Sequence, residues 1–232
     1  MAARYALYFA PLADRPLWEF GSAAIGWDAE TATECPARPP APALAPGWAE
    51  ATAEPRRYGF HATLKAPFAL AEGTRAEDLL AAAEAFAAGP RPVPQLRLTV
   101  RILAGFVALV PEGPSAALDS LAAACVRDFD RFRRPLTPAE RARRAPERLS
   151  PRQVEYLDRW GYPFVFEEFR FHMTLTGRLP PDAAEAASAA LQAAHRQACG
   201  DRLTAVSTLA VFVQPSPAER FRILAAWPLR AG

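Results

Sequence analysis

The chain has 232 residues, 51% of them apolar and 22% charged, and a formal net charge of +2. This length is enough for one large or bilobed domain with a real core, and so small a net charge gives no general attraction to nucleic acid or membranes. The cysteines, Cys35, Cys125 and Cys199, are far apart and form no C-x-x-C pair, which argues against a disulfide framework or a zinc site. No stretch reaches the roughly 18 apolar residues of a spanning helix, and the N-terminal apolar run is too short for a signal sequence. We therefore expect a cytoplasmic protein without membrane contacts.

Hydrophobic periodicity, N-cap residues and glycine or proline stops predict strands that alternate with helices. In chain order we expect a strand over 4–11, a helix over 15–28, a proline-rich surface loop over 35–55, a strand around His61, a helix over 74–89, strands over 95–103 and 105–111, a helix over 115–132, two short helices within 131–163, a strand over 169–177, a helix over 180–200, and strands near 204–213 and 219–228. Thr74 is the expected N-cap of the helix over 74–89. The short helices are expected to begin at Thr137-Pro138 and Ser150-Pro151.

The segment over about 131–163 is rich in arginine. Seven arginines and only two acidic residues lie between Arg131 and Arg148. Such a segment can close over a cleft as a lid, contact a polyanionic substrate, or form a solvated face, which is the commonest role of a charge run. The sequence leaves these three interpretations open.

Two of the three histidines stand in the same short pattern, HATL at 61–64 and HMTL at 172–175. They are 172 − 61 = 111 residues apart, close to half of the chain. This spacing predicts two halves of similar build, either from an internal duplication or from pseudo-symmetry. The third histidine, His195, lies in an alanine-rich helical segment without this pattern, so we expect it to be structural.

Alternate side chains of a strand share one face, so each pattern predicts a polar row opposite an apolar one. The first row consists of His61, Thr63 and Lys65, and the second of Arg170, His172, Thr174 and Thr176. Lys65 is the only lysine among 27 basic residues, in a chain that otherwise uses arginine. Neither row contains a carboxylate, so both rows suit an anion.

These groups are the ones that cleavage of a phosphoester needs. One neutral imidazole can take a proton from the attacking water or hydroxyl, and a protonated imidazole can give one to the leaving oxygen. Threonine hydroxyls can donate hydrogen bonds to phosphate oxygens, and Lys65 or Arg170 can stabilise developing charge. A metal hydrolase would need clustered His, Asp or Glu ligands, and no P-loop or G-x-G-x-x-G is present. We therefore expect no metal and no cofactor.

The paired motifs resemble those of the two-histidine (2H) phosphoesterase superfamily, which includes the LigT-like RNA 2′,3′-cyclic phosphodiesterases. The flanking sequences, RRYGFHATLKAPF and RLSPRQVEYLDRWGYPFVFEEFRFHMTLTGRL, resemble a narrower bacterial branch, the DUF1045 proteins, often labelled as phosphonate metabolism proteins. The resemblance covers nearly the whole chain. It implies a bilobed, pseudo-two-fold α+β fold, in which two antiparallel sheets form a V-shaped cleft with helices outside. Residues 1–232 would then form one domain that carries the arginine-rich segment as an insert.

The resemblance also implies roles for residues of the two motifs. His61 and His172 would be the acid and base, in either order, and Thr63 and Thr174 would bind the phosphate without a metal. Lys65 and Arg170 are added from the strand geometry alone. Tyr8, on the opposite face of its strand from its apolar neighbours, is expected to line the cleft.

The function expected from these features is a metal-independent phosphodiesterase that acts on a cyclic or small phosphate ester. A nucleotide or an RNA end is also open as a ligand, and a role in phosphonate metabolism rests on the label of the branch. A binding module that uses the same cleft without turnover is the alternative, and a scaffold or regulator is a third. We take a monomer as the default state.

Overall fold

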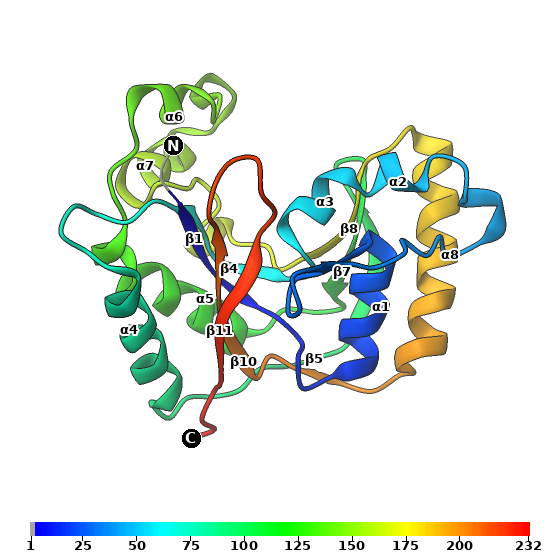
Figure 1. The fold of residues 1–232 in the computed structure, drawn as a ribbon, viewed down its shortest axis with the longest axis horizontal. Helices are drawn as coiled ribbons and strands as arrows, with labels where there is room; N and C mark the ends of the chain where they lie inside the picture. The colour runs from blue at the N-terminus through cyan, green and yellow to red at the C-terminus, as the bar shows by residue number, and fades with distance from the viewer. Residues whose placement is uncertain (1–2) are drawn as a thin grey trace.

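The structure, a computed structural model, describes residues 3–232. Its main element is a seven-stranded antiparallel sheet in the order β11-β10-β1-β4-β8-β7-β6 (Figure 1). These strands are β1 (Arg4–Phe9), β4 (Ala62–Phe68), β6 (Leu98–Leu103), β7 (Phe106–Pro111), β8 (Met173–Arg178), β10 (Thr208–Gln214) and β11 (Arg222–Pro228). Two short pairs lie outside it: β2 (Trp27–Asp28) with β3 (Thr33–Glu34), and β5 (Gln95–Leu96) with β9 (Thr204–Ala205).

The α-helices are α1 (Arg15–Ile25), α2 (Trp48–Ala51), α3 (Ala53–Tyr58), α4 (Ala76–Ala88), α5 (Ala116–Asp128), α6 (Pro138–Ala142), α7 (Pro151–Trp160) and α8 (Pro181–Cys199). Short 3₁₀ turns cover Pro42–Leu44, Asp130–Phe132, Pro146–Arg148 and Phe166–Glu168. Within residues 3–232, no helix combines the length and the apolar character that crossing a membrane requires.

The large sheet consists of two lobes that meet at one point. Strands β11, β10, β1 and β4 form the first lobe, and β8, β7 and β6 form the second. A single residue pair, Ala62 with Met173, joins β4 to β8. Because the two strands pair nowhere else, the lobes separate on either side of this point. The predicted α+β fold with antiparallel sheets is thus confirmed, and its two sheets are continuous through one backbone pairing.

Both lobes draw on both halves of the chain. Helices α4 and α5 pack on the first lobe, and α1 and α8 pack on the second (Figure 1). The chain therefore passes from the first lobe, where β1 lies, to the second lobe, where α1 packs. Strands β10 and β11, from the end of the chain, complete the first lobe. The two histidine-bearing strands, β4 and β8, are neighbours at the centre.

A glycine in α1 permits close packing beside the first histidine. Phe60 is fully buried, and a Cβ atom added to Gly21 would lie 2.2 Å from its ring. Only a residue without a side chain allows the helix to approach that ring. The packing of Gly21 against Phe60 thus fixes the residue that immediately precedes His61.

Three expectations about elements are wrong. The segment 35–55 is not all loop, because α2 and the start of α3 lie in it; buried Trp48 anchors α2 by a hydrogen bond from Nε1 to the carbonyl of Ala24 (2.8 Å). Thr74 does not cap α4, because Arg75 is the N-cap residue and its amide donates to the carboxylate of Asp78 (3.0 Å). The second histidine strand begins at Met173 rather than at 169, since a 3₁₀ turn closely precedes it.

The two short helices of the insert begin where the sequence predicts. The hydroxyl of Thr137 accepts from the amide of Glu140, and the hydroxyl of Ser150 accepts from the amide of Gln153 (both 3.2 Å). The Glu140 and Gln153 side chains accept from the cap amides in return. Each start is a capping box, which satisfies amides that a helix otherwise leaves without partners.

Candidate active site

The pair Ala62–Met173 organises the two H-x-T motifs. Both residues are fully buried, so their neighbours along each strand project to the opposite face, into the cleft between the lobes. Because the strands are antiparallel, the histidine of one motif lies across from the threonine of the other. The cleft is therefore lined by a pseudo-symmetric set of four polar side chains, each half-buried: His61, Thr63, His172 and Thr174.

Both imidazoles are oriented by the same local hydrogen bond. Nδ1 of His61 lies 2.8 Å from the carbonyl oxygen of Gly59, and Nδ1 of His172 lies 2.8 Å from that of Arg170. A carbonyl can only accept, so each Nδ1 carries a proton and donates it. This leaves Nε2 of each ring for the cleft. Nε2 of His61 lies 3.3 Å from Oγ1 of Thr63.

His61 sits in a more enclosed environment than a surface histidine. Its ring stacks on Tyr8, with centroids 3.6 Å apart and planes at 16°. Burial lowers the pKa of His61 to about 4; the hydrogen bond to Gly59 opposes this change, and the charge of His172 adds to it. His61 is therefore neutral near pH 7, the state that a general base requires. Tyr8 lines the cleft, and burial raises its pKa well above the usual value.

Lys65 borders the same cleft as His61 and Thr63, but the pairing of its strand departs from the expected alternation. In the pairing of β1 with β4, Leu7 is opposite Lys65 and Tyr8 is opposite Thr63, which leaves Leu64 as an extra residue. Such a β-bulge reverses the alternation beyond it. Lys65 is therefore opposite Leu7, and its ammonium group reaches α5 at the border of the cleft instead of standing beside Thr63.

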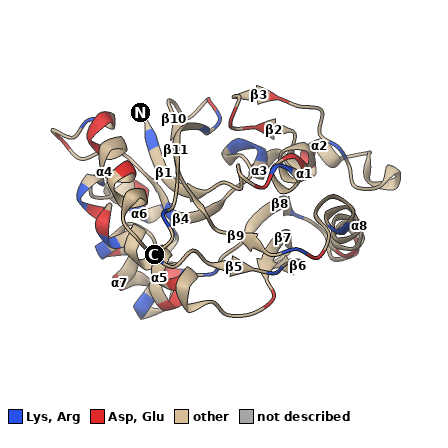
Figure 2. Cartoon of the chain, turned by 90° about the horizontal axis from the view of Figure 1, so that it is seen from below, with Lys and Arg blue, Asp and Glu red and all other residues tan. Residues whose placement is uncertain are grey.

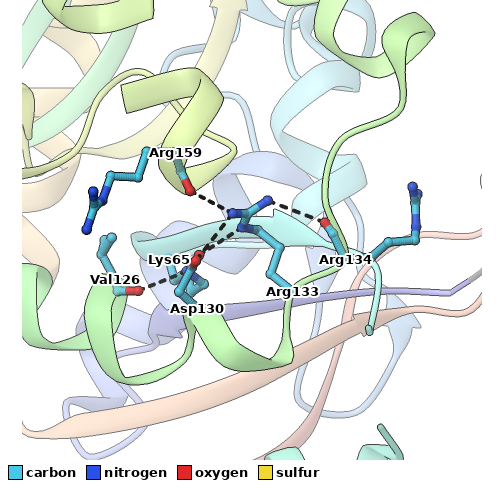
Figure 3. A network of polar contacts seen from close by, with 6 residues as sticks. All are labelled: Lys65, Val126, Asp130, Arg133, Arg134 and Arg159. Atoms are coloured by element: carbon cyan, nitrogen blue, oxygen red, sulfur yellow. Dashed lines mark hydrogen bonds and ion pairs between the residues drawn. The ribbon is translucent and has the colours of Figure 1, made fainter. Parts of the chain in front are cut away.

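The ammonium group of Lys65 is part of a buried ion-pair network (Figure 3). Nζ donates to the carbonyl of Val126 (3.0 Å) and to Oδ1 of Asp130 (3.1 Å), and the side chain is 4% exposed. Arg133 donates to the same carboxylate through Nε (2.8 Å) and to the carbonyl of Arg159 through Nη2 (2.9 Å). The network thus joins β4 to the beginning of the insert and to the end of α7.

Arg170 lies outside the expected polar row, whereas Thr176 lines the cleft with His172 and Thr174 but has its hydroxyl engaged by the backbone. Arg170 is exposed and does not line the cleft; its Nη1 donates to the carbonyls of Glu167 (2.8 Å) and Phe169 (2.7 Å). Thr176 is fully buried, and its hydroxyl accepts from the amide of Val107 (3.0 Å). Neither residue is therefore positioned as a phosphate ligand beside the histidines.

The cleft has a volume of about 840 Å³ and is bordered by arginines that the motif search missed. Those without a carboxylate partner among residues 3–232 are Arg4, Arg57, Arg143, Arg144 and Arg178. Basic segments are visible on β1, on α3 and near the insert in Figure 2. Arg4 could have been found, because it is four residues before Tyr8 and so shares its face. The contribution of the insert could not, because it depends on where the insert packs.

The remaining polar clusters of the described chain lie apart from this cleft. His195 is buried in α8 and meets the ring of Phe20 edge-on, at a centroid distance of 5.6 Å. Across residues 3–232, no three His, Cys, Asp or Glu side chains are grouped closely enough to hold a metal ion. The cleft of the two H-x-T motifs is therefore the candidate active site.

A family model with the description "Protein of unknown function (DUF1045)" matches residues 63–222, more than half of the chain. The chain belongs to this family. Two curated relatives share the name ribose 1,5-bisphosphate phosphokinase PhnN. The one from Janthinobacterium sp. (strain Marseille) is 44% identical over 180 residues, which cover 76% of this chain and 39% of the relative. The one from Laribacter hongkongensis (strain HLHK9) is 39% identical over 239 residues, which cover 99% of this chain and 53% of the relative. The DUF1045 chain thus spans about half, or less, of the length of these relatives.

Solved structures resemble the DUF1045 protein over its whole length, but at low identity. A crystal structure of a phosphoesterase is 16% identical with a TM-score of 0.43, and E. coli LigT complexed with NADP+ is 15% identical with a TM-score of 0.43. E. coli LigT complexed with 3′-AMP is 16% identical with a TM-score of 0.42. Each match covers 99% of both chains.

Proposed function

We propose that this DUF1045 protein is a metal-independent phosphodiesterase that opens a cyclic or other small phosphate ester by two-histidine acid–base catalysis. The observation that carries the proposal is the symmetric presentation of the two motifs around the pair Ala62–Met173. Both imidazoles donate from Nδ1 to a carbonyl two residues earlier, so both Nε2 atoms are free for proton transfer.

In this proposal His61 is the base, because it is neutral near pH 7, and His172 takes the role of the acid. Neutral His61 takes a proton from water at Nε2 while the water oxygen attacks phosphorus. Protonated His172 gives its Nε2 proton to the ester oxygen as the P–O bond breaks, so that water is added across that bond. Thr63 and Thr174 donate hydrogen bonds to the phosphate oxygens that carry the growing charge.

The name of the curated relatives describes a kinase, and this chain lacks the features of one. Its sequence contains no G-x-x-x-x-G-K-[ST] motif, and its only lysine, Lys65, is held in a buried ion pair. We infer that the kinase activity belongs to the part of those relatives outside the matched region. The diesterase would then act on a related phosphate ester, and a link to phosphonate metabolism is part of this proposal.

Product analysis on a panel of cyclic phosphates tests the function. The panel includes nucleoside 2′,3′-cyclic and ribose 1,2-cyclic esters, each incubated with and without EDTA. His61→Ala and His172→Ala should each lose about 10²- to 10⁴-fold in turnover, since each removes one proton-transfer group. Arg170→Gln is the comparison variant beside the second motif and should retain turnover, because its guanidinium faces away from the cleft.

Two results would contradict the proposal: hydrolysis by His172→Ala at the parent rate, or loss of activity on chelation. Ligand binding without product would favour the alternative, a nucleotide- or RNA-end-binding module. For that alternative, affinity should fall steeply between low and moderate salt, because the arginines of the cleft would contact several phosphates.

A further inference from the structure

The cleft carries more positive charge than one phosphodiester can use. A single diester has one negative charge, whereas five lining arginines have no carboxylate partner among residues 3–232. The whole chain has a net charge of only +2, so this concentration is local. Other arginines of the insert are neutralised: Arg133 by Asp130, Arg134 by Glu140 and Arg141 by Asp158.

Two of the free arginines, Arg4 and Arg144, are held in place by neutral groups. Nε of Arg4 donates to Oε1 of Gln214 (2.9 Å), and its guanidinium lies 5.3 Å from the ring centroid of Phe221. The guanidinium of Arg144 lies 5.4 Å from the ring centroid of Tyr162. An amide and aromatic rings fix the direction of a guanidinium without neutralising it, as a preformed anion site requires.

Both arginines line the same cleft as Tyr8 and His61. Arg4 and Tyr8 share one face of β1. The start of β1 lies near the start of the insert, because Tyr5 pairs with Phe68 and the amide of Arg134 donates to the carbonyl of Ala69. The ring of Phe221, over which Arg4 lies, is 6.4 Å from the Tyr8 ring, and Tyr162, over which Arg144 lies, lines the same cleft. Burial raises the pKa of Tyr8, and the charges of Arg4 and Arg144 both oppose that rise. The Tyr8 ring in turn stacks on His61. The two arginines therefore face a region next to the catalytic histidines, reached from β1 on one side and the insert on the other.

We propose that Arg4 and Arg144 form a second anion subsite, which binds a phosphate monoester of the substrate other than the ester that is cleaved. The ligand class is a cyclic phosphodiester that carries a separate phosphate group. Arg4 lies four residues from Tyr8, which is about 13 Å along the strand. The Arg4 side chain extends toward Tyr8 and shortens this gap, so the two phosphates would be separated by roughly one sugar unit. As a description of the substrate, this inference rests on the proposed function; as a binding site, it stands separately.

Binding by calorimetry tests the subsite without requiring turnover. The probes are adenosine 3′,5′-bisphosphate and adenosine 3′-monophosphate, which differ by one phosphate. The wild-type chain should bind the bisphosphate about 10- to 100-fold more tightly, and Arg144→Gln or Arg4→Gln should remove most of that ratio. Arg148→Gln is the matched control: it removes the same charge from the same insert at a residue that does not line the cleft, and it should leave the ratio unchanged.

The kinetic arm compares adenosine 2′,3′-cyclic phosphate with and without a 5′-phosphate. Arg144→Gln should raise KM for the 5′-phosphorylated ester about 10-fold or more and leave the other ester unaffected. Equal binding of both probes by the wild type, or an equal effect of Arg148→Gln, would overturn the subsite. If the wild type hydrolyses neither these esters nor any other member of the cyclic phosphate panel, yet shows the binding ratio, the proposed function fails and the subsite stands.

Discussion

Removing either partner of the buried pair Lys65–Asp130 should cost very different amounts of stability. In Asp130→Asn, the ammonium of Lys65, whose side chain is 4% exposed, keeps only the carbonyl of Val126 and a neutral amide as acceptors. Arg133, 10% exposed, loses its carboxylate as well. A buried charge left without its partner costs about 3–5 kcal/mol.

In Lys65→Met, the carboxylate of Asp130 keeps its hydrogen bonds from Arg133, at 2.8 and 3.3 Å. Methionine also fills most of the volume of the lysine stem. The loss is then two hydrogen bonds from a charged donor, against a smaller cost of burying the side chain, and we expect about 1–2 kcal/mol. Asp130→Asn should therefore destabilise the fold by at least about 1 kcal/mol more than Lys65→Met.

Urea unfolding at pH 7, followed by tryptophan fluorescence, measures both free energies of unfolding. Asp158→Asn is the matched control, since it makes the same change in the exposed pair with Arg141, and it should cost less than about 1 kcal/mol. Burial already lowers the pKa of Lys65 and Asp130 opposes that change, so in Asp130→Asn the lysine can lose its proton. The folded state then binds fewer protons than the unfolded state, and the variant should regain stability as pH rises toward lysine's ordinary pKa of about 10.4. A loss in Lys65→Met equal to or larger than that in Asp130→Asn would refute this account of the network.

Four further outcomes follow from individual residues. Because burial lowers the pKa of His61 to about 4, the acid limb of kcat/KM should lie near pH 4–5, and a limb at about 6.5 would show that His61 is not the base. Between about pH 6.5 and 4, the His61 side chain binds a proton more readily in the unfolded state than in the folded state. Acidification over this range should therefore remove up to about 3 kcal/mol of stability. Urea titrations of His61→Asn should lack this loss. Gly21→Ala should lower the free energy of unfolding by about 1–3 kcal/mol, because a Cβ would lie 2.2 Å from the Phe60 ring; a variant as stable as the parent would mean that the ring can move. Ser150→Ala should cost about 1 kcal/mol in the same assay through the lost cap of α7, whereas Ser150→Asp, which can also cap, should cost much less.

Local patterns predicted most of the elements because the signals are local. The capping boxes at Thr137 and Ser150 depend on residues three positions apart, and the strands of the second lobe follow from alternation. The candidate site was predictable for the same reason. His61 and His172 each precede one residue of the buried pair Ala62–Met173, so period two predicts that both face the cleft.

What could not be predicted depends on contacts between distant segments. The bulge at Leu64 arises from the pairing of β4 with β1, and one extra residue was enough to turn the ammonium group of Lys65 toward α5. The carboxylate of Asp130, which accepts from Lys65, is 65 residues away in sequence. The position of Arg144 over the cleft likewise depends on how the whole insert packs.

The same bulge explains how one strand serves two purposes. Before it, Thr63 faces the cleft beside His61; after it, Lys65 faces α5 and fixes the carboxylate that also holds Arg133. Arg133 in turn binds the carbonyl of Arg159 at the end of α7, so the insert is tied at both ends to the strand that follows His61. Any shift of the insert that moved Arg144 away from the cleft would have to break this network or carry β4 with it. The lone lysine is therefore better understood as a support for the arginine side of the cleft than as a ligand for phosphate.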